Sequence, residues 1–257
     1  MIPFPHSDVK GFPEKIKKAK EKKERICIKT LFAGNHQRKT KKERTFMQKE
    51  FLGSETAKNL MRAFAGESQA RNRYTFAAGE AKRSGLYAVS EIFRFTAEQE
   101  KEHAEIFYKH LSSLAGKTLH IDGGYPVDIS DDIGVLLSAA SHNEYEESDV
   151  VYRAFGETAR EEGFLTVAAS FFAIAAIEKV HGNRFAEVAR LLSSGKWFTG
   201  DGEEPFLCLN CGHIHKGKEV PSVCPVCQHD RGYFIRTSLA PYTSVSLLRL
   251  SENTVKM

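Results

Sequence analysis

The sequence predicts a mainly α protein, in which a four-helix bundle with one long crossover is followed by a small module built around a metal ion. Three observations support this prediction. Four stretches of roughly 30 residues have the apolar spacing of a helix, and each ends at a glycine. A linker rich in Gly, Asp and Pro separates the second stretch from the third. Two Cys-x-x-Cys pairs follow the last stretch, in a segment with no helical period.

The composition excludes several other classes of protein. With 41% hydrophobic and 27% charged residues, the 257-residue chain is globular rather than disordered or collagen-like. The longest apolar run, 164–177, is too short to span a bilayer and suits a buried helix. The amino terminus has no apolar stretch followed by a small-residue cleavage site, so we expect a cytoplasmic protein without a membrane partner. In a reducing compartment, close cysteine pairs are expected to bind metal rather than form disulfides.

The net positive charge of the chain comes entirely from its first 46 residues. Residues 1–46 carry 14 Lys and Arg against 5 Asp and Glu, whereas residues 47–257 carry 23 against 28. We interpret 1–46 as a basic, disordered tail; the alternatives are an arm for nucleic acid or a membrane surface, and a native start at Met47. The acidic body gives no reason to expect a nucleic-acid partner.

The helical segments are justified in order by their ends. The first begins at about Ser54, a residue type that caps helices, and the last ends at Gly195. Residues 117–130 are long enough to carry the chain from one end of a bundle to the other. Together these features describe a ferritin-like bundle over residues 47–196. The predicted helices cover about 54–85, 87–116, 131–163 and 164–195.

Each helix has an apolar stripe that a glutamate interrupts near its middle. In the third helix, for example, Glu144 and Glu147 interrupt the stripe, and apolar residues resume at Val151 and Ala154. Burying a carboxylate costs several kcal/mol even after relaxation, and no Lys or Arg lies on these stripes to neutralise the group. A bound cation is the usual remedy. The interrupting residues are Glu67, Glu100, Glu144 with Glu147, and Glu178.

The spacing of these residues specifies the kind of cation. Glu100 and His103 are separated by three positions, as are Glu178 and His181, so each pair shares one helix face. One Glu from each of two helices and a Glu-x-x-His from each of the others form the di-iron or di-manganese carboxylate arrangement. Glu147, one turn beyond Glu144, is either a rim glutamate or a seventh ligand used in one redox state.

The cysteine pairs predict a second metal site in residues 201–237. Cys208 and Cys211 form one pair, and Cys224 and Cys227 form the other. Two such pairs close a tetrahedral four-thiolate site, which takes zinc or iron, and spacing alone does not decide between them. The neighbouring redox-capable bundle favours iron. Residues 238–257 show no informative pattern, and their role is left open.

Residues 47–237 resemble the rubrerythrins. The resemblance is carried by Ala63-Phe-Ala-Gly-Glu67-Ser-Gln-Ala-Arg-Asn-Arg-Tyr74, Glu98-Gln-Glu-Lys-Glu-His103, Ala159-Arg-Glu-Glu-Gly163, Glu178-Lys-Val-His181 and a rubredoxin-like cysteine module. It implies two non-haem irons in the bundle, one iron in the module, and reduction of hydrogen peroxide to water as an oxidative-stress defence. It also implies an electron-donor redox protein as partner, and a homodimer or larger homo-oligomer. The implied ligands of the iron pair are Glu67, Glu100, Glu144, Glu147, Glu178 and His181.

The resemblance further assigns roles around these ligands. It implies that His103 replaces Glu147 as ligand to one iron when the site is reduced, and that Tyr74 and Tyr152 hydrogen-bond ligand carboxylates. Two positions of the module depart from the family pattern: Gln228 stands where a glycine is usual, and His213 where an aromatic is common. Three other functions stay open, namely iron oxidation and storage, an oxygen-reducing di-iron oxidase, and a zinc-ribbon nucleic-acid binder.

Overall fold

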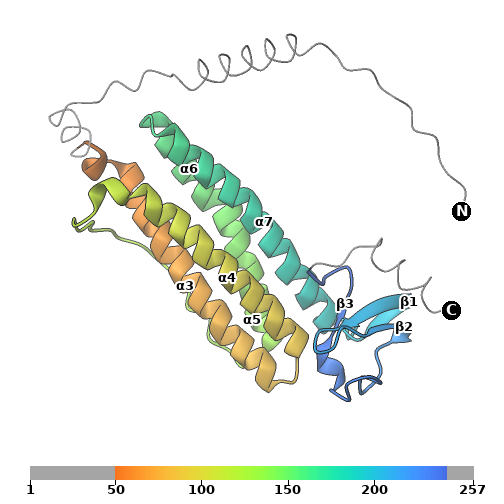
Figure 1. Cartoon of the computed structure of the whole chain (residues 1–257). Coiled ribbons are helices and arrows are strands. Elements are labelled where there is room, and N and C mark those ends of the chain that lie inside the picture. Colours follow the sequence, from red (N-terminus) through yellow and green to blue (C-terminus); the bar gives the residue numbers. More distant parts are fainter. Residues whose placement is uncertain (1–49, 242–257) are drawn as a thin grey trace, which may run out of the picture. The chain divides into compact units, whose positions relative to one another are not determined.

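The computed structural model describes residues 50–241, which all belong to one compact unit. The predicted tail 1–46 with Cys27, and residues 242–257 of the predicted extension, lie outside the described residues. Figure 1 shows long helices side by side, followed by a small antiparallel sheet. The mainly α fold class predicted from the sequence is confirmed.

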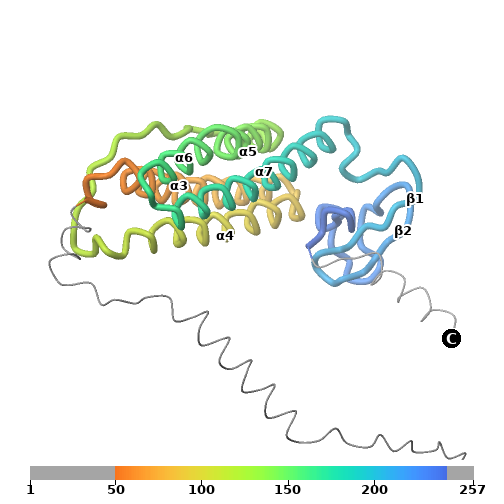
Figure 2. Tube along the Cα trace, turned by 90° about the horizontal axis from the view of Figure 1, so that it is seen from above, coloured from red at the N-terminus to blue at the C-terminus, as the bar shows by residue number. Residues whose placement is uncertain are grey.

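Four helical rods form the bundle, and the third of them is composite. The first two rods are α3 (Glu55–Arg83) and α4 (Tyr87–His110), which pack on each other. The third consists of α5, a π-helical segment η2 and α6, and it packs on the fourth, α7. The view from above in Figure 2 shows the crossover, which connects α4 to α5, running along the bundle. The remaining bounds are η1 Ser112–Leu114, α5 Ile133–Glu146, η2 Glu147–Val151, α6 Tyr152–Glu161 and α7 Leu165–Ser193.

The helix ends follow the local chemistry that the sequence indicates. Ser54 caps α3, its side chain accepting a hydrogen bond from the Ala57 backbone N–H, and Asp132 caps α5 in the same way. The four terminal glycines all have positive φ, between 68° and 83°, which only glycine adopts without strain. One boundary differs: α4 ends at His110, and a single 3-10 turn then leads to Gly116. These glycines are Gly85, Gly116, Gly163 and Gly195.

The composite third rod corrects the prediction of one continuous helix over 131–163. Residues Glu147–Val151 form a π turn, which takes one more residue than an α turn. The extra residue rotates everything after it, so Tyr152 is buried where Val151 is expected to be. Ala154, predicted on the buried stripe, is exposed for the same reason. Hydrophobic spacing cannot reveal such an insertion, because it assumes a constant 3.6-residue period.

The helix α7 combines high hydropathy with a buried functional face. By length and composition it could cross a membrane, since its most apolar 18-residue window has a mean hydropathy of 1.3. Its inward residues instead complete the core of the bundle, where Phe171 and Phe185 are fully buried. Two polar residues, Glu178 and His181, are buried on the same face. The helix is therefore a core element that brings polar groups into the bundle.

The carboxy-terminal module is a three-stranded antiparallel sheet with the order β2-β1-β3. Its small core contains Phe206, Val220 and Phe234 together with two of the cysteines. The Tyr233 ring stacks on Tyr87 at the start of α4, with centroids 4.2 Å apart and ring planes 13° apart. The module thus packs against the end of the bundle. Its strands are β1 Thr199–Cys208, β2 Ile214–Glu219 and β3 Phe234–Arg236.

Candidate metal centre

The glutamates and histidines of the bundle form two overlapping clusters. In each cluster, four ligand atoms lie within 4.8 Å of one another, and all the residues are buried. Glu100 and Glu178 belong to both clusters, so one carboxylate from α4 and one from α7 are shared. We call the clusters the Glu67 site (Glu67, Glu100, His103, Glu178) and the Glu144 site (Glu100, Glu144, Glu178, His181).

The two sites have matching geometry. In the Glu67 site, His103 Nδ1 lies 2.8 Å from Glu178 Oε1 and 3.0 Å from Glu100 Oε2. In the Glu144 site, His181 Nδ1 lies 2.8 Å from Glu178 Oε2 and 3.1 Å from Glu100 Oε1. Each shared carboxylate therefore presents one oxygen to each histidine. This is the geometry expected of carboxylates that bridge two cations.

The chemistry of these atoms fits a pair of metal ions. Several buried atoms of the two sites make no well-aligned hydrogen bond within the described structure, although some of them lie 2.8–3.1 Å from an ion-pair partner. Orphaned buried groups of this kind are costly, and their convergence on common points indicates ligands rather than a hydrogen-bonded core. Carboxylate and imidazole donors in this number suit iron or manganese. The atoms are Glu67 Oε2, Glu100 Oε1, Glu144 Oε2, both oxygens of Glu178 and both ring nitrogens of His181.

Two buried tyrosines hold the unshared glutamates. The Tyr152 hydroxyl donates to Glu67 Oε1 at 2.6 Å, and the Tyr74 hydroxyl donates to Glu144 Oε1. Burial raises the pKa of both tyrosines well above 10, so the hydroxyls remain protonated donors. Each bond leaves the other oxygen of its glutamate, Oε2, facing the cluster. The positions predicted for Tyr74 and Tyr152 thus lie beside the two sites, one tyrosine to each.

The carboxyl groups and histidines of the centre shift one another's pKa values. Burial would lower the pKa of both histidines, but the surrounding carboxylates outweigh it and raise the pKa of His181 to about 11 and that of His103 further. Burial also raises the pKa of Glu67 to about 8 and that of Glu144 well above its ordinary value. Burial would raise the pKa of Glu178 too, but hydrogen bonds and charge from the two histidines outweigh burial and lower that pKa to about 2. The raised pKa values favour the protonated form of both histidines, so metal binding must displace these protons.

Glu147 occupies a different position from the other glutamates. It lies in the π turn, outside both clusters, and its side chain lines a pocket of about 330 Å³. The residue is partly exposed, yet its carboxyl group loses much of its hydration, which with the nearby charges of Glu67 and Glu144 raises its pKa well above the ordinary value. Of the seven bundle ligands predicted from the sequence, the structure brings six together and places Glu147 at the pocket beside them.

One further residue near the centre was missed by the sequence argument. The half-buried guanidinium of Arg184 donates to Thr96 Oγ1 at 3.0 Å and to Gln99 Oε1 at 3.3 Å. Its charge is felt at Glu100 and Glu144. Arg184 follows His181 by three positions, so its place on the same face could have been read from helical spacing.

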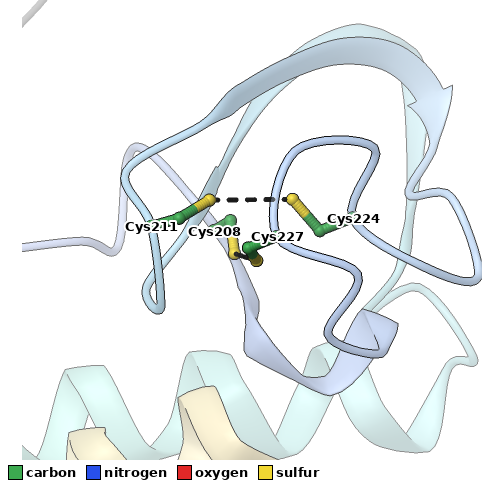
Figure 3. Close-up of side chains that lie close together, drawn as sticks. All are labelled: Cys208, Cys211, Cys224 and Cys227. Carbon is green, nitrogen blue, oxygen red and sulfur yellow. Dashed lines mark hydrogen bonds between the residues drawn. The ribbon is translucent and has the colours of Figure 1, made fainter.

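The four cysteines of the module converge, as Figure 3 shows. Their sulfurs all lie within 4.8 Å of one another, with Cys208 and Cys227 3.8 Å apart and Cys211 and Cys224 3.7 Å apart. A tetrahedral site with metal–sulfur bonds of about 2.3 Å requires sulfur separations of about 3.8 Å. These two distances match the separation that a four-thiolate metal site requires.

The backbone around the cysteines forms two similar knuckles. Gly212 N–H donates to Cys208 O at 2.8 Å, and Gln228 N–H donates to Cys224 O at 3.0 Å. Both turn residues have positive φ, 78° for Gly212 and 62° for Gln228. Gln228, the departure noted in the sequence, is thus held in a conformation that favours glycine. In the second knuckle, the His229 backbone N–H lowers the pKa of Cys227 to about 6, which favours the thiolate.

Comparisons with known proteins agree with both sites. The rubrerythrin family model matches residues 58–189, and the model of the rubrerythrin rubredoxin-like domain matches residues 206–235. The chain belongs to the rubrerythrin family. It is 44% identical over 187 residues to the rubrerythrin of Clostridium perfringens, covering 72% of this chain and 96% of the relative. It is 40% identical over 186 residues to the rubrerythrin of Nitratidesulfovibrio vulgaris, with the same coverage.

A solved structure of nigerythrin, in its fully reduced, all-ferrous state, is also similar to this chain. The sequence identity is 29% and the TM-score 0.49, covering 72% of this chain and 87% of that one. Membership of the rubrerythrin family confirms the fold class and the two kinds of metal site predicted from the sequence. This rubrerythrin therefore combines a ferritin-like di-iron site of carboxylates and histidines with a rubredoxin-like four-cysteine site.

Proposed function

We propose that this protein is a non-haem di-iron peroxidase, which reduces hydrogen peroxide to water with electrons that arrive through the four-cysteine iron. The proposal depends on one observation: the same chain contains both a thiolate metal site and a pair of bundle sites. The two bundle sites share Glu100 and Glu178. Storage of iron requires no such electron carrier, whereas repeated reduction of peroxide does. The proposed ligands are the residues of the Glu67 and Glu144 sites and the four cysteines.

A pair of ferrous ions in the bundle supplies the two electrons and the Lewis acidity that cleavage of the O–O bond requires. The protein residues hold and supplement that pair. Glu100 and Glu178 fix the spacing of the two sites, while Tyr74 and Tyr152 orient the unshared glutamates. Groups that hydrogen-bond to a metal ligand in this way tune the basicity and the orientation of that ligand.

Glu147 and His103 are proposed to exchange as ligands. Support for this exchange, which the family resemblance implies, is that His103 belongs to the Glu67 site while Glu147 lies outside both clusters. The raised pKa of Glu147, caused by burial and by the neighbouring carboxylates, favours the protonated carboxyl group, which would let Glu147 act as a proton donor. Arrival of the carboxylate as a ligand would add negative charge to the centre when the metals are oxidised.

Electrons are proposed to reach the bundle through the cysteine site, from an electron-donor redox protein. We further infer a homodimer or larger assembly in the cytoplasm, in which the cysteine site of one subunit serves the di-iron site of another. Metal analysis and visible spectroscopy of the purified protein test the relay. Iron–thiolate colour should bleach with reductant and return when peroxide is added. A colourless zinc site would contradict the relay, as would iron that peroxide fails to reoxidise.

A substitution tests the role of Glu147. Glu147→Gln should slow peroxide turnover while the iron content stays close to that of the wild type, because the residue lies outside both four-ligand clusters. Glu161→Gln, at an exposed position on α6, is the matched control and should change neither quantity. Full peroxidase activity in Glu147→Gln would contradict the proposed exchange.

The rival functions predict different measurements. An iron-storage protein would take up far more iron than the two kinds of site hold, and a di-iron oxidase would turn over dioxygen faster than peroxide. Comparing the two oxidants at equal concentration, with the same reduced protein, separates the oxidase from the peroxidase. A nucleic-acid binder would bind tightly and in a salt-sensitive manner.

A further inference from the structure

The pocket beside Glu147 is larger than hydrogen peroxide requires. Its volume of about 330 Å³ falls in the range of roughly 300–1,000 Å³ in which proteins bind small organic molecules. Hydrogen peroxide, with two oxygen atoms, needs only about 60 Å³ if each oxygen takes the share of a water molecule. The pocket therefore has room for an organic group attached to a peroxide.

The pocket lies beside residues that contact the Glu67 site. Glu147 lines it, and so does Tyr152, whose hydroxyl holds the Glu67 carboxylate at 2.6 Å. The far side opens to solvent, since Val150 is 61% exposed and Tyr125 39% exposed. A molecule in the pocket would thus have one end near the Glu67 site and the other toward the surface.

The walls of the pocket are mainly apolar and already ordered. Most of its side chains come from the crossover, the π turn and α6: Tyr125, Pro126, Val150, Val151, Ala154 and Phe155. The crossover is fixed in place, since the Tyr125 hydroxyl donates to Arg62 O at 3.0 Å. Asp128 Oδ2 lies 2.6 Å from Arg73 Nη1 and accepts a hydrogen bond from Asn143 Nδ2 at 2.7 Å. A preformed apolar wall favours an uncharged organic group, because no ordering cost opposes its binding.

The charged groups at the pocket disfavour an anionic ligand. Arg62 is the only cationic side chain among the described residues that line it, and its guanidinium already pairs with Glu55 and Asp122. Glu146 and Glu147 add carboxyl groups without a further basic partner in the lining. Asn143 is likewise already engaged by Asp128. Because the Arg62 and Asn143 side chains are already engaged, the lining favours an uncharged ligand over a carboxylate or a phosphate.

We propose that this pocket binds small, uncharged organic hydroperoxides and that the protein reduces them at the same centre. This inference rests on the proposed peroxidase function and names a further class of substrate for it. The reaction is ROOH + 2 e⁻ + 2 H⁺ → ROH + H₂O. The O–O bond would break, a ferrous pair held by the Glu67 and Glu144 sites would supply the two electrons, and water would supply the two protons. The organic group would stay in the pocket until the alcohol leaves.

Steady-state turnover of cumene hydroperoxide and hydrogen peroxide by the iron-loaded protein tests the proposal. The wild type should reduce both. Ala154→Phe and Val150→Phe should each fill the pocket and lower kcat/KM for cumene hydroperoxide by about tenfold or more, the scale of hydrophobic-pocket discrimination. The value for hydrogen peroxide should stay within about twofold. Val135→Phe, on an exposed site of α5 outside the pocket, is the matched control and should leave both values unchanged.

A binding measurement complements turnover. The product, cumyl alcohol, should bind the oxidised iron protein saturably, its proton relaxation should be enhanced by the nearby irons, and Ala154→Phe should abolish the effect. A wild type that reduces only hydrogen peroxide would overturn the substrate inference and leave the peroxidase function standing. Equal loss of both activities in the filled variants would also overturn it. A wild type that reduces neither would overturn the peroxidase function and the inference with it.

Discussion

Replacing either buried tyrosine by phenylalanine should weaken one metal site and spare the other. Tyr152→Phe removes the O–H that holds Glu67, and Tyr74→Phe removes the one that holds Glu144, while the ring and its packing remain. Glu67 and Glu144 each belong to a single cluster. The two substitutions should therefore affect different metal ions, although they are chemically identical.

The expected size follows from the kind of bond that is lost. A hydrogen bond to a charged group contributes about 1.5–3 kcal/mol, and the carboxylate oxygens here are fully buried, so water does not replace the lost donor. Loss of a partner that orients a metal ligand typically weakens metal binding by about 10–100-fold, or about 1.4–2.8 kcal/mol. The two figures agree. We expect one of the two binding constants of each variant to fall by that amount.

Titration of metal-free protein with a divalent metal, against a competing chelator, resolves the two binding steps. Tyr152→Phe should change one step, Tyr74→Phe the other, and the double variant both. Tyr145→Phe is the control, because its hydroxyl donates to Asn183 at 2.9 Å on the exposed surface and touches neither site. The reasoning is refuted if both tyrosine variants weaken the same step, or if neither differs from the control.

Three further predictions follow from the same geometry. Glu178→Ala should lose both bundle metals because the carboxylate is shared, whereas Glu67→Ala should retain one, as metal analysis after gel filtration would show. Metal loading of the apoprotein should release the protons of both His103 and His181, whose pKa values are raised, and below about pH 8 the proton of Glu67 as well. Metal affinity should therefore fall as the pH is lowered. A pH-indicator titration that shows no proton release would contradict this prediction. Gln228→Gly should stabilise the protein by about 1 kcal/mol in denaturant unfolding, since it relieves a positive φ; an unchanged or lower midpoint would count against strain at this turn.

The sequence was sufficient where local rules act alone. Ser54 and the terminal glycines Gly85 and Gly163 mark helix ends by capping chemistry, and the structure places the ends there. The convergence of the Glu-x-x-His pairs was equally predictable, because residues three positions apart share a helix face whatever surrounds them. The i, i+3 spacing rule requires only that the helix is unbroken around the Glu-x-x-His pair.

The π turn breaks that condition, and the errors begin there. Ala154 was expected in the core and is exposed, while Tyr152 takes the buried position one residue late. The pocket was also beyond prediction, because its walls come partly from the crossover and partly from the adjoining π turn and α6, which α5 separates from the crossover in sequence. Only tertiary packing brings Tyr125 opposite Ala154.

The π turn also explains how the third rod can present both Glu144 and Tyr152 to the metal centre. Glu144 lies before the turn and faces the metal centre, and Tyr152 lies after it and reaches Glu67. In an unbroken α-helix, Val151 would hold the inward position and Tyr152 would be rotated by about 100° away from the core. The inserted residue instead turns the Tyr152 hydroxyl inward and leaves Glu147 beside the pocket. Deleting Val151 should therefore cost the protein both the support of Glu67 and the pocket, whereas a conservative Val151→Ile change should preserve both.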